Sequence, residues 1–385
     1  MMAFSFGKIS ESLGNIFGGA KEATALGIDI GASSVKIVQI RASRGTAILE
    51  TYGEIALGPY GTAAIGKAVK ITPERTAEAL TDLMREANVT ARTGGLSIPF
   101  SSSLVTILDL PKVDAETLKR VVPIEARKYI PLPISEVTLD WFVIPADEGE
   151  NSSAFDQLQA PAPIRAKGQE VLLVAIHNDI LSNYQTIAAA AGITVNFYEI
   201  EIFSAIRSSI GHGIAPILVV DLGASTTKMY VVERGVVRMT HLVTAGGMHM
   251  TENLARSLDW EFEKAERVKR ELGLIDSNAY STDENDKIKT ALLSTLGRVF
   301  SEIDRVLLSY GQRYNKNVSH VLLTGGGATL PGLSEQAKLS LHAEVEIADP
   351  FSHTEAPAFL EGVLREIGPG FAVSVGLALR KLRSE

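Results

Sequence analysis

Two short segments of the chain repeat a set of residues that could bind phosphate and a metal ion. Residues 26–41 read LGIDIGASSVKIVQIR and residues 218–233 read LVVDLGASTTKMYVVE. Asp29 aligns with Asp221 and Lys36 with Lys228, an offset of 221 − 29 = 192 residues. A carboxylate at a strand end can hold a hydrated magnesium ion. A lysine nearby could neutralise phosphate oxygens, and of the two Lys36 is favoured because it follows the first loop.

A glycine-led turn follows each aspartate. Gly31 and Gly223 allow the backbone to approach a ligand closely. The N–H groups and hydroxyls of the next three residues can face an anion; these residues are Ala32, Ser33 and Ser34 in the first copy and Ala224, Ser225 and Thr226 in the second. Two ordinary hairpins remain the alternative, but two matching copies, each ending in lysine, favour a phosphate site.

A third motif, HVLLTGGGATLPGL, covers residues 320–333. An apolar strand runs into Gly325, Gly326 and Gly327. Three glycines after a buried strand indicate a planar ligand lying against bare backbone. A flexible turn is the other interpretation of these glycines taken alone. Pro331 is expected to start a helix at Gly332.

The elements that position these residues follow from the apolar pattern. Each repeated segment predicts a strand, a tight turn and a second strand, so the repeat predicts two similar α/β halves. The chain has 385 residues, 45% hydrophobic and 21% charged, which suits a soluble protein of two domains. A net charge of −8 and the lack of a basic cluster argue against nucleic-acid binding. No cysteine, transmembrane segment or signal peptide is found, so we expect a cytoplasmic protein.

Together the three segments resemble the phosphate-1, phosphate-2 and adenosine motifs of the actin-like ATPase superfamily. The resemblance implies an actin/hexokinase-type (ribonuclease H-like) fold with duplicated domains, which binds ATP and Mg²⁺. It places Asp29 and Asp221 at the metal and adds Ala328, which follows the three glycines, to the nucleotide contacts.

Residues 108–144, LDLPKVDAETLKRVVPIEARKYIPLPISEVTLDWFVI, resemble the type IV pilus assembly family PilM. The resemblance implies a subdomain 1C of the FtsA/PilM type, inserted in the first domain, with a helix that Pro123 could kink. The expected division is a tail at 1–24, subdomain 1A at 25–95, subdomain 1C at 96–195 with a mobile loop at 149–168, a connecting segment at 196–216, a second domain at 217–360 and a closing helix at 361–385.

Further site residues come from the same resemblance. Gly246 and Gly247 correspond to a glycine pair after phosphate-2, with Thr251 beginning a helix. Glu266 and Lys269 match a helix segment that contacts ribose in FtsA-like proteins, although a solvent-facing ion pair is the simpler explanation. Glu199 and Glu201 lie in the connecting motif that orients attacking water, with both glutamates expected on one strand face. Glu199 is the candidate catalytic residue, in a protein that is at most a slow ATPase. Phe351 and Gly376, which would begin the closing helix, are assigned to structure.

PilM-like proteins bind ATP and capture the cytoplasmic N-terminal peptide of the inner-membrane protein PilN, and they link it to the pilus motor ATPases. The resemblance therefore implies an adaptor that is peripheral to the inner membrane through its partner, with a peptide groove between the first subdomain and 1C. Leu104, Val105, Ile107 and Leu110 could line that groove or belong to the core. A small-molecule kinase and a polymerising FtsA-like protein are the alternatives, and a homo-oligomer is left open. The composition of the tail, residues 1–24, indicates a flexible or partner-binding segment rather than a membrane helix.

Overall fold

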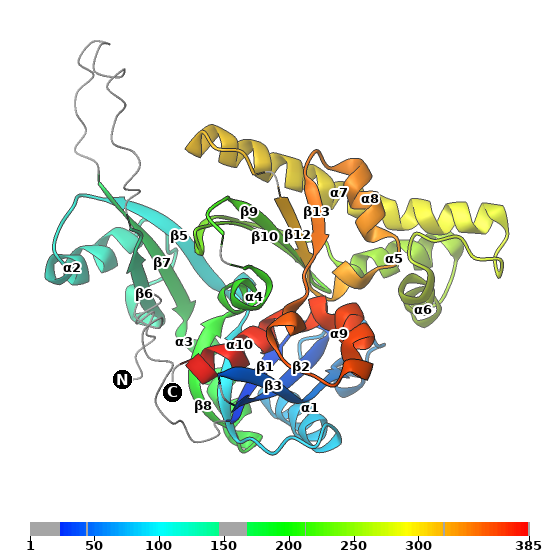
Figure 1. Cartoon of the computed structure of the whole chain (residues 1–385), viewed down its shortest axis with the longest axis horizontal. Coiled ribbons are helices and arrows are strands. Elements are labelled where there is room, and N and C mark those ends of the chain that lie inside the picture. Colours follow the sequence, from blue (N-terminus) through cyan, green and yellow to red (C-terminus); the bar gives the residue numbers. More distant parts are fainter. Residues whose placement is uncertain (1–23, 44, 146–167, 212, 319, 384–385) are drawn as a thin grey trace, which may run out of the picture. The chain divides into compact units, whose positions relative to one another are not determined.

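The computed structural model describes residues 24–43, 45–145, 168–211, 213–318 and 320–383 (Figure 1). They form two compact units, one of residues 102–180 and one of residues 24–101 with 181–383. The predicted tail lies outside the described residues except for Thr24, and the predicted loop at 149–168 does so except for Gly168.

Thirteen strands are found in the described part of the chain. Their bounds are β1 Thr24–Ile30, β2 Ser34–Ser43, β3 Thr46–Ala56, β4 Thr93–Ile98, β5 Ser103–Leu110, β6 Val137–Val143, β7 Gln169–His177, β8 Thr194–Ile200, β9 Ile217–Leu222, β10 Thr227–Glu233, β11 Val236–Val243, β12 His320–Thr324 and β13 Glu344–Ile347.

The α-helices are α1 Pro73–Glu86, α2 Ala115–Ala126, α3 Asn178–Ala190, α4 Glu201–Ser209, α5 Gly247–Leu258, α6 Phe262–Leu272, α7 Thr282–Tyr314, α8 Leu333–Ser340, α9 Glu361–Ile367 and α10 Ala372–Arg383. Short 3₁₀ helices are η1 Gly58–Gly61, η2 Phe100–Ser102, η3 Ile134–Glu136, η5 Gly326–Thr329, η6 Pro350–His353, η7 Ala358–Leu360 and η8 Gly368–Phe371.

The larger unit contains two five-stranded sheets of the same topology. Their strand orders are β3-β2-β1-β4-β8 and β11-β10-β9-β12-β13. In each sheet the first three strands form an antiparallel meander, and the last two strands are parallel to the first. This repeated topology is the duplication that the two sequence segments predict.

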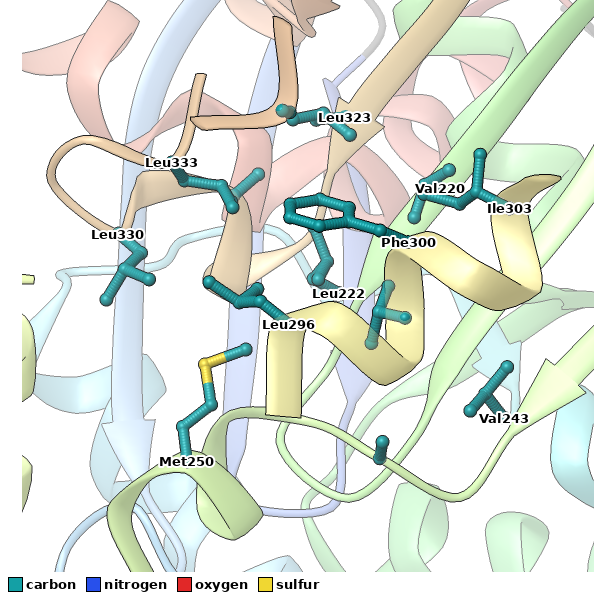
Figure 2. Packing of buried hydrophobic residues seen from close by; sticks show 14 of the residues in the cluster. Val220, Leu222, Val243, Met250, Leu296, Phe300, Ile303, Leu323, Leu330 and Leu333 are labelled. Atoms are coloured by element: carbon teal, nitrogen blue, oxygen red, sulfur yellow. The ribbon is translucent and has the colours of Figure 1, made fainter. Parts of the chain in front are cut away.

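The long helix α7 covers the second sheet. Ser281 and Glu284 form a capping box at its start, and Asn315 ends it in the left-handed conformation with φ 52°. Figure 2 shows Leu296, Phe300 and Ile303 of this helix among side chains of the sheet and of the loop before α8. These buried contacts hold β9 and β12, which carry Asp221 and the glycine motif, in fixed positions.

Two glycines let helix α10 pack closely, Gly27 of the first sheet against α10 and Gly376 of α10 against α4. A Cβ atom at Gly27 would lie 1.9 Å from the carbonyl oxygen of Ser374, and one at Gly376 would lie 1.9 Å from that of Ser204. Only glycine therefore permits these approaches. Gly376 and Phe351 are structural, as predicted, because Phe351 packs in an aromatic cluster with Tyr52 and Phe371. The helix begins at Ala372, earlier than expected for Gly376.

One helical stretch among the described residues, Ala358–Leu382, has the length and mean hydropathy of a membrane span. The protein itself buries 67% of its most apolar window. Buried core helices share this composition, so the finding is weak evidence of a membrane span.

The smaller unit is a three-stranded sheet, β5-β7-β6, with α2 packed on it. It runs over Ser102–Ile180, narrower than the expected 96–195, because β4 and β8 are hydrogen-bonded neighbours in the first sheet of the larger unit. Helix α2 continues through Pro123 to Ala126. Of the four residues that could line a groove or belong to the core, Val105 and Leu110 are buried and belong to the core.

Candidate functional site

The two repeated hairpins have the same backbone geometry. Gly31 N–H donates to the Ser34 carbonyl at 2.9 Å, and Gly223 N–H donates to the Thr226 carbonyl at 3.0 Å. Asp29 lies opposite Lys36 in the β1–β2 pair, as Asp221 lies opposite Lys228 in β9–β10. The sequence repeat is therefore a structural repeat down to the register of the acid and the lysine.

In the first hairpin the aspartate and the lysine have different hydrogen-bond partners, although the Lys36 ammonium is close enough to oppose the rise in the Asp29 pKa that burial causes. The Asp29 carboxylate accepts a hydrogen bond from the Ser97 hydroxyl at 2.8 Å, and burial raises the pKa of Asp29. The Lys36 ammonium instead donates to the Ser34 hydroxyl at 2.8 Å and pairs with Glu54 at 2.9 Å. Asp29 has the ligand chemistry that a hydrated magnesium ion requires, so this position fits the predicted metal.

The second hairpin brings its lysine and aspartate into direct contact. Lys228 Nζ lies 3.0 Å from Asp221 Oδ2 and 2.6 Å from Glu201 Oε2. The other Glu201 oxygen accepts the backbone N–H of Phe100 at 2.7 Å. Burial raises the pKa of Glu201, and the Lys228 ammonium opposes that rise. Glu201 is the first residue of α4, so the two glutamates do not share a strand as expected.

The glycine motif forms a tight turn beside both hairpins. Gly325, with φ 82°, donates its N–H to the Pro369 carbonyl at 2.9 Å, and a Cβ atom there would lie 2.3 Å from Asp221 Oδ1. At Gly326 a Cβ atom would meet no described atom within 4 Å. Bare backbone thus borders open space, as a planar ligand needs. Ala328 is buried behind it, with 1% of its surface exposed.

Gly246 and Gly247 pack against the phosphate-2 loop. Gly247 N–H donates to the Gly223 carbonyl at 3.0 Å, and Met248 N–H to the Ala224 carbonyl at 2.9 Å. The glycines permit this approach, because a Cβ atom at Gly246 would lie 2.5 Å from the Gly223 oxygen. Helix α5 begins at Gly247, so Thr251 lies inside it rather than at its start.

Glu266 and Lys269 form a buried network rather than a solvent-facing pair. Lys269 Nζ lies 2.7 Å from Glu266 and 3.0 Å from the Gly247 carbonyl, and the Thr251 hydroxyl donates to Glu266 at 2.5 Å. Although burial opposes ionisation, the Lys269 ammonium lowers the pKa of Glu266. The network connects the predicted ribose residues to the phosphate-2 loop, and a contact to ribose stays a prediction.

Glu199 faces away from these motifs, toward two arginines. It forms a two-pronged pair with Arg207 at 2.7 and 2.8 Å and also accepts from Arg380 and the Ser204 hydroxyl. Burial alone would raise the pKa of Glu199. The Arg207 guanidinium and the other partners lower it by more than burial raises it, so the net shift of the pKa is downward. A carboxylate held in this way has the character of a structural ion pair. Glu201, which contacts Lys228, lies nearer the predicted phosphate loops.

Three residues near the site were not predicted from the sequence. Ser97 in β4 contacts Asp29, Glu54 in β3 contacts Lys36, and Gly370 in η8 lies against Gly326 and Lys36. A serine, a glutamate and a glycine in separate elements carry no motif, and only the tertiary fold brings them together. The Gly368-Pro369-Gly370 run is a local turn signal that could have drawn attention to the last of them.

The fold is that of the actin-like ATPases. MreB5 of Spiroplasma citri, solved with ADP, superposes with a TM-score of 0.50 at 11% identity, over 94% of this chain and 97% of that one. A solved PilM-PilN type IV pilus biogenesis complex gives a TM-score of 0.75 at 24% identity, over 94% of this chain and 99% of that one.

The sequence model of the type IV pilus assembly protein PilM matches residues 27–382, and the chain belongs to this family. Cell division protein FtsA of Rhizobium meliloti is a relative that is 29% identical over 42% of this chain and 39% of its own length. FtsA of Enterococcus faecalis is 22% identical over 86% of this chain and 80% of its own length. The chain therefore spans about two fifths of the length of the first of these relatives.

Proposed function

We propose that this chain is an ATP-binding adaptor of type IV pilus assembly that captures the cytoplasmic N-terminal peptide of a PilN-like membrane protein. The family match over residues 27–382 carries the proposal. The solved complex of a PilM with a PilN supports the choice of partner. The adaptor would lie on the cytoplasmic side of the inner membrane through that partner, where it could also reach the pilus motor ATPases.

The two hairpins and the glycine turn would hold the nucleotide. Gly31 and Gly223 lead loops whose hydroxyls and N–H groups suit phosphate oxygens. Lys36, which lies against Gly370, would contribute a positive charge to the phosphates, and the adenosine would lie on the open side of Gly326. Asp29 would hold the hydrated magnesium ion, which shields the phosphate charge when it is bound. Glu199 belongs to an ion-pair cluster, so these residues favour binding over rapid hydrolysis.

Nucleotide would act on the adaptor by shifting a conformational equilibrium. A ligand moves such an equilibrium only as far as its affinities for the two states differ. ATP bound between the hairpins favours the state in which both contact it, and the peptide-binding state would be coupled to that one.

The smaller unit offers apolar side chains for a peptide. Beside its buried core it exposes Ile124, Tyr129, Leu132 and Val143, which lie in or after α2 and at the end of β6. Tyr129 and Ile124 expose 46% and 63% of their surfaces. An amphipathic or extended peptide gains affinity by covering such side chains.

Nucleotide binding is tested with purified protein, Mg²⁺ and ATP, by measuring bound nucleotide and released phosphate together. We expect tight binding with little release. Asp29→Asn should weaken Mg²⁺-ATP binding about tenfold or more, because one charged ligand is lost. Unchanged affinity in Asp29→Asn would contradict the metal assignment, and the absence of any binding would contradict the nucleotide site.

Peptide capture is tested with a fluorescent synthetic peptide of the cytoplasmic N-terminus of the PilN-like protein from the same genome. Tyr129→Asp should reduce its affinity about tenfold or more, as expected for an aromatic anchor. Phe359→Asp is the matched control, since Phe359 is 83% exposed in the larger unit. Equal losses in both variants, or none in Tyr129→Asp, would rule out this surface.

A further inference from the structure

Lys228 sits in a buried triad at the second hairpin. Its ammonium lies 3.0 Å from Asp221 Oδ2 and 2.6 Å from Glu201 Oε2, and the three side chains are only 9–12% exposed. Two adjacent carboxylates in a buried position repel each other unless a cation lies between them. In this structure the cation is a side chain of the protein.

The first hairpin shows that this arrangement is not dictated by the repeat. Lys36 occupies the equivalent register position opposite Asp29. Its ammonium nevertheless turns to Ser34 and Glu54, while Asp29 accepts from a neutral hydroxyl, that of Ser97. The two halves thus share a backbone and differ in where the lysine charge is placed.

Three of the four carboxylate oxygens of the triad already have a polar partner. Asp221 Oδ2 and Glu201 Oε2 contact the ammonium, and Glu201 Oε1 accepts the Phe100 N–H at 2.7 Å. Asp221 Oδ1 faces the Gly325 backbone, since a Cβ atom at that glycine would lie 2.3 Å away. A divalent cation added here would lie beside a fixed positive charge, which opposes its binding.

The same ammonium is next to the phosphate-2 loop. Lys228 Nζ lies 4.0 Å from the position of a Cβ atom on Gly223. An ammonium at the loop can balance the two carboxylates and also attract a phosphate oxygen. It therefore combines two tasks that a divalent ion would otherwise perform at this hairpin.

We propose that Lys228 is a resident cation of the second hairpin, so that Asp221 and Glu201 do not recruit a divalent ion and Asp29 alone provides the metal carboxylate. The inference rests on the proposed nucleotide binding, but its main test does not need nucleotide.

The test is Mn²⁺ titration of the nucleotide-free full chain, followed by electron paramagnetic resonance. We expect Lys228→Gln to create a Mn²⁺ site absent from the unmodified chain, and Lys228→Gln with Asp221→Asn to lose it. Lys36→Gln is the matched control and should create no site that depends on Asp221. An Asp221-dependent Mn²⁺ site in the unmodified chain would overturn the proposal, as would a folded Lys228→Gln protein without the new site.

A second measurement covers the case in which Lys228→Gln does not fold. The ratio of ATP affinities with Mg²⁺ and with a chelator is compared in the unmodified chain, Asp29→Asn and Asp221→Asn. We expect Asp29→Asn to remove the Mg²⁺ dependence and Asp221→Asn to leave the ratio within about twofold. A ratio that collapses in Asp221→Asn contradicts the resident cation. No ATP binding by the unmodified chain under either condition contradicts the proposed function instead.

Discussion

At the scale of single residues, the interior of the larger unit contains one tyrosine hydroxyl with a partner and one without. Tyr230 is 1% exposed, and its hydroxyl has no hydrogen-bond partner among the described residues. Tyr310 is fully buried and donates to Glu233 at 3.2 Å. An unpaired buried polar group costs free energy, whereas a bond to a carboxylate stabilises the fold.

Replacing these tyrosines by phenylalanine should therefore have opposite effects. Tyr230→Phe removes a buried hydroxyl that lacks a partner, so the free energy of unfolding should stay the same or rise. Tyr310→Phe should lower it by about 1 to 3 kcal/mol, because Glu233 loses a donor. Urea denaturation of the two variants measures both values. A loss in Tyr230→Phe as large as that in Tyr310→Phe would show that the Tyr230 hydroxyl has a partner in solution.

Glu199 makes the free energy of unfolding depend on pH in the acidic range. Its pKa is held below the ordinary value of 4.5, chiefly by Arg207 against the opposing effect of burial. The unfolded chain then binds the proton more readily than the folded chain, so the stabilisation is present above pH 4.5 and is lost as the pH falls toward the folded pKa.

We expect Glu199→Gln to destabilise the protein near pH 7 by about 3 to 5 kcal/mol, since Arg207 loses its buried partner. The difference from the unmodified chain should shrink as the pH is lowered from 7 to a value below 4.5, because the unfolded carboxylate is protonated first and the folded one then loses its advantage. Denaturant unfolding at both pH values measures this, with the exposed Glu86→Gln as control. A difference that does not change with pH would mean that Glu199 acts by packing alone. A large change in phosphate release with little change in stability would return Glu199 to a catalytic role.

At the scale of elements, the three glycines after β12 perform different tasks. A Cβ atom at Gly326 meets no described atom within 4 Å, whereas one at Gly327 would lie 2.8 Å from Leu222 Cβ. A side chain at Gly326 would therefore enter the open space of the site, whereas one at Gly327 would disturb the packing against β9.

Gly326→Trp should abolish ATP binding and leave the melting temperature nearly unchanged. Gly327→Ala should lower the melting temperature, because a methyl group there overlaps the β9 backbone and Leu222. Isothermal titration with ATP and thermal melting of both variants separate the two effects. Full ATP binding by Gly326→Trp would remove the adenosine assignment.

Some features of these elements were predictable from the sequence and others were not. The hairpins were predictable because Asp, Gly and Lys recur at one spacing, and the register of each acid–lysine pair follows from the strands that flank the turn. The direction of each lysine was not predictable, since it depends on Glu54 and Glu201, which come from separate elements. The ion-pair partners of Glu199 were not predictable for the same reason, because Arg207 and Arg380 reach it only in the folded chain. The limits 96–195 were too wide, since strand pairing places β4 and β8 in the first sheet.

At the scale of the whole molecule, nucleotide and peptide would bind to different units of one chain. The hairpins belong to the unit of residues 24–101 and 181–383, and the exposed apolar residues around Tyr129 belong to the unit of residues 102–180. Two ligands on one protein influence each other only through a coupling free energy, and that energy is the same from either side.

An adaptor controlled by nucleotide must therefore show reciprocal coupling. If saturating Mg²⁺-ATP raises peptide affinity by some factor, saturating peptide must raise ATP affinity by that factor, expected at about five- to 150-fold. Titrating each ligand in the absence and presence of the other measures both. Tyr129→Asp should remove the effect of peptide on ATP while leaving ATP binding itself intact, and Gly326→Trp should remove the effect of ATP on peptide. Tight binding of both ligands without coupling would leave ATP as a structural ligand and exclude nucleotide control of peptide capture.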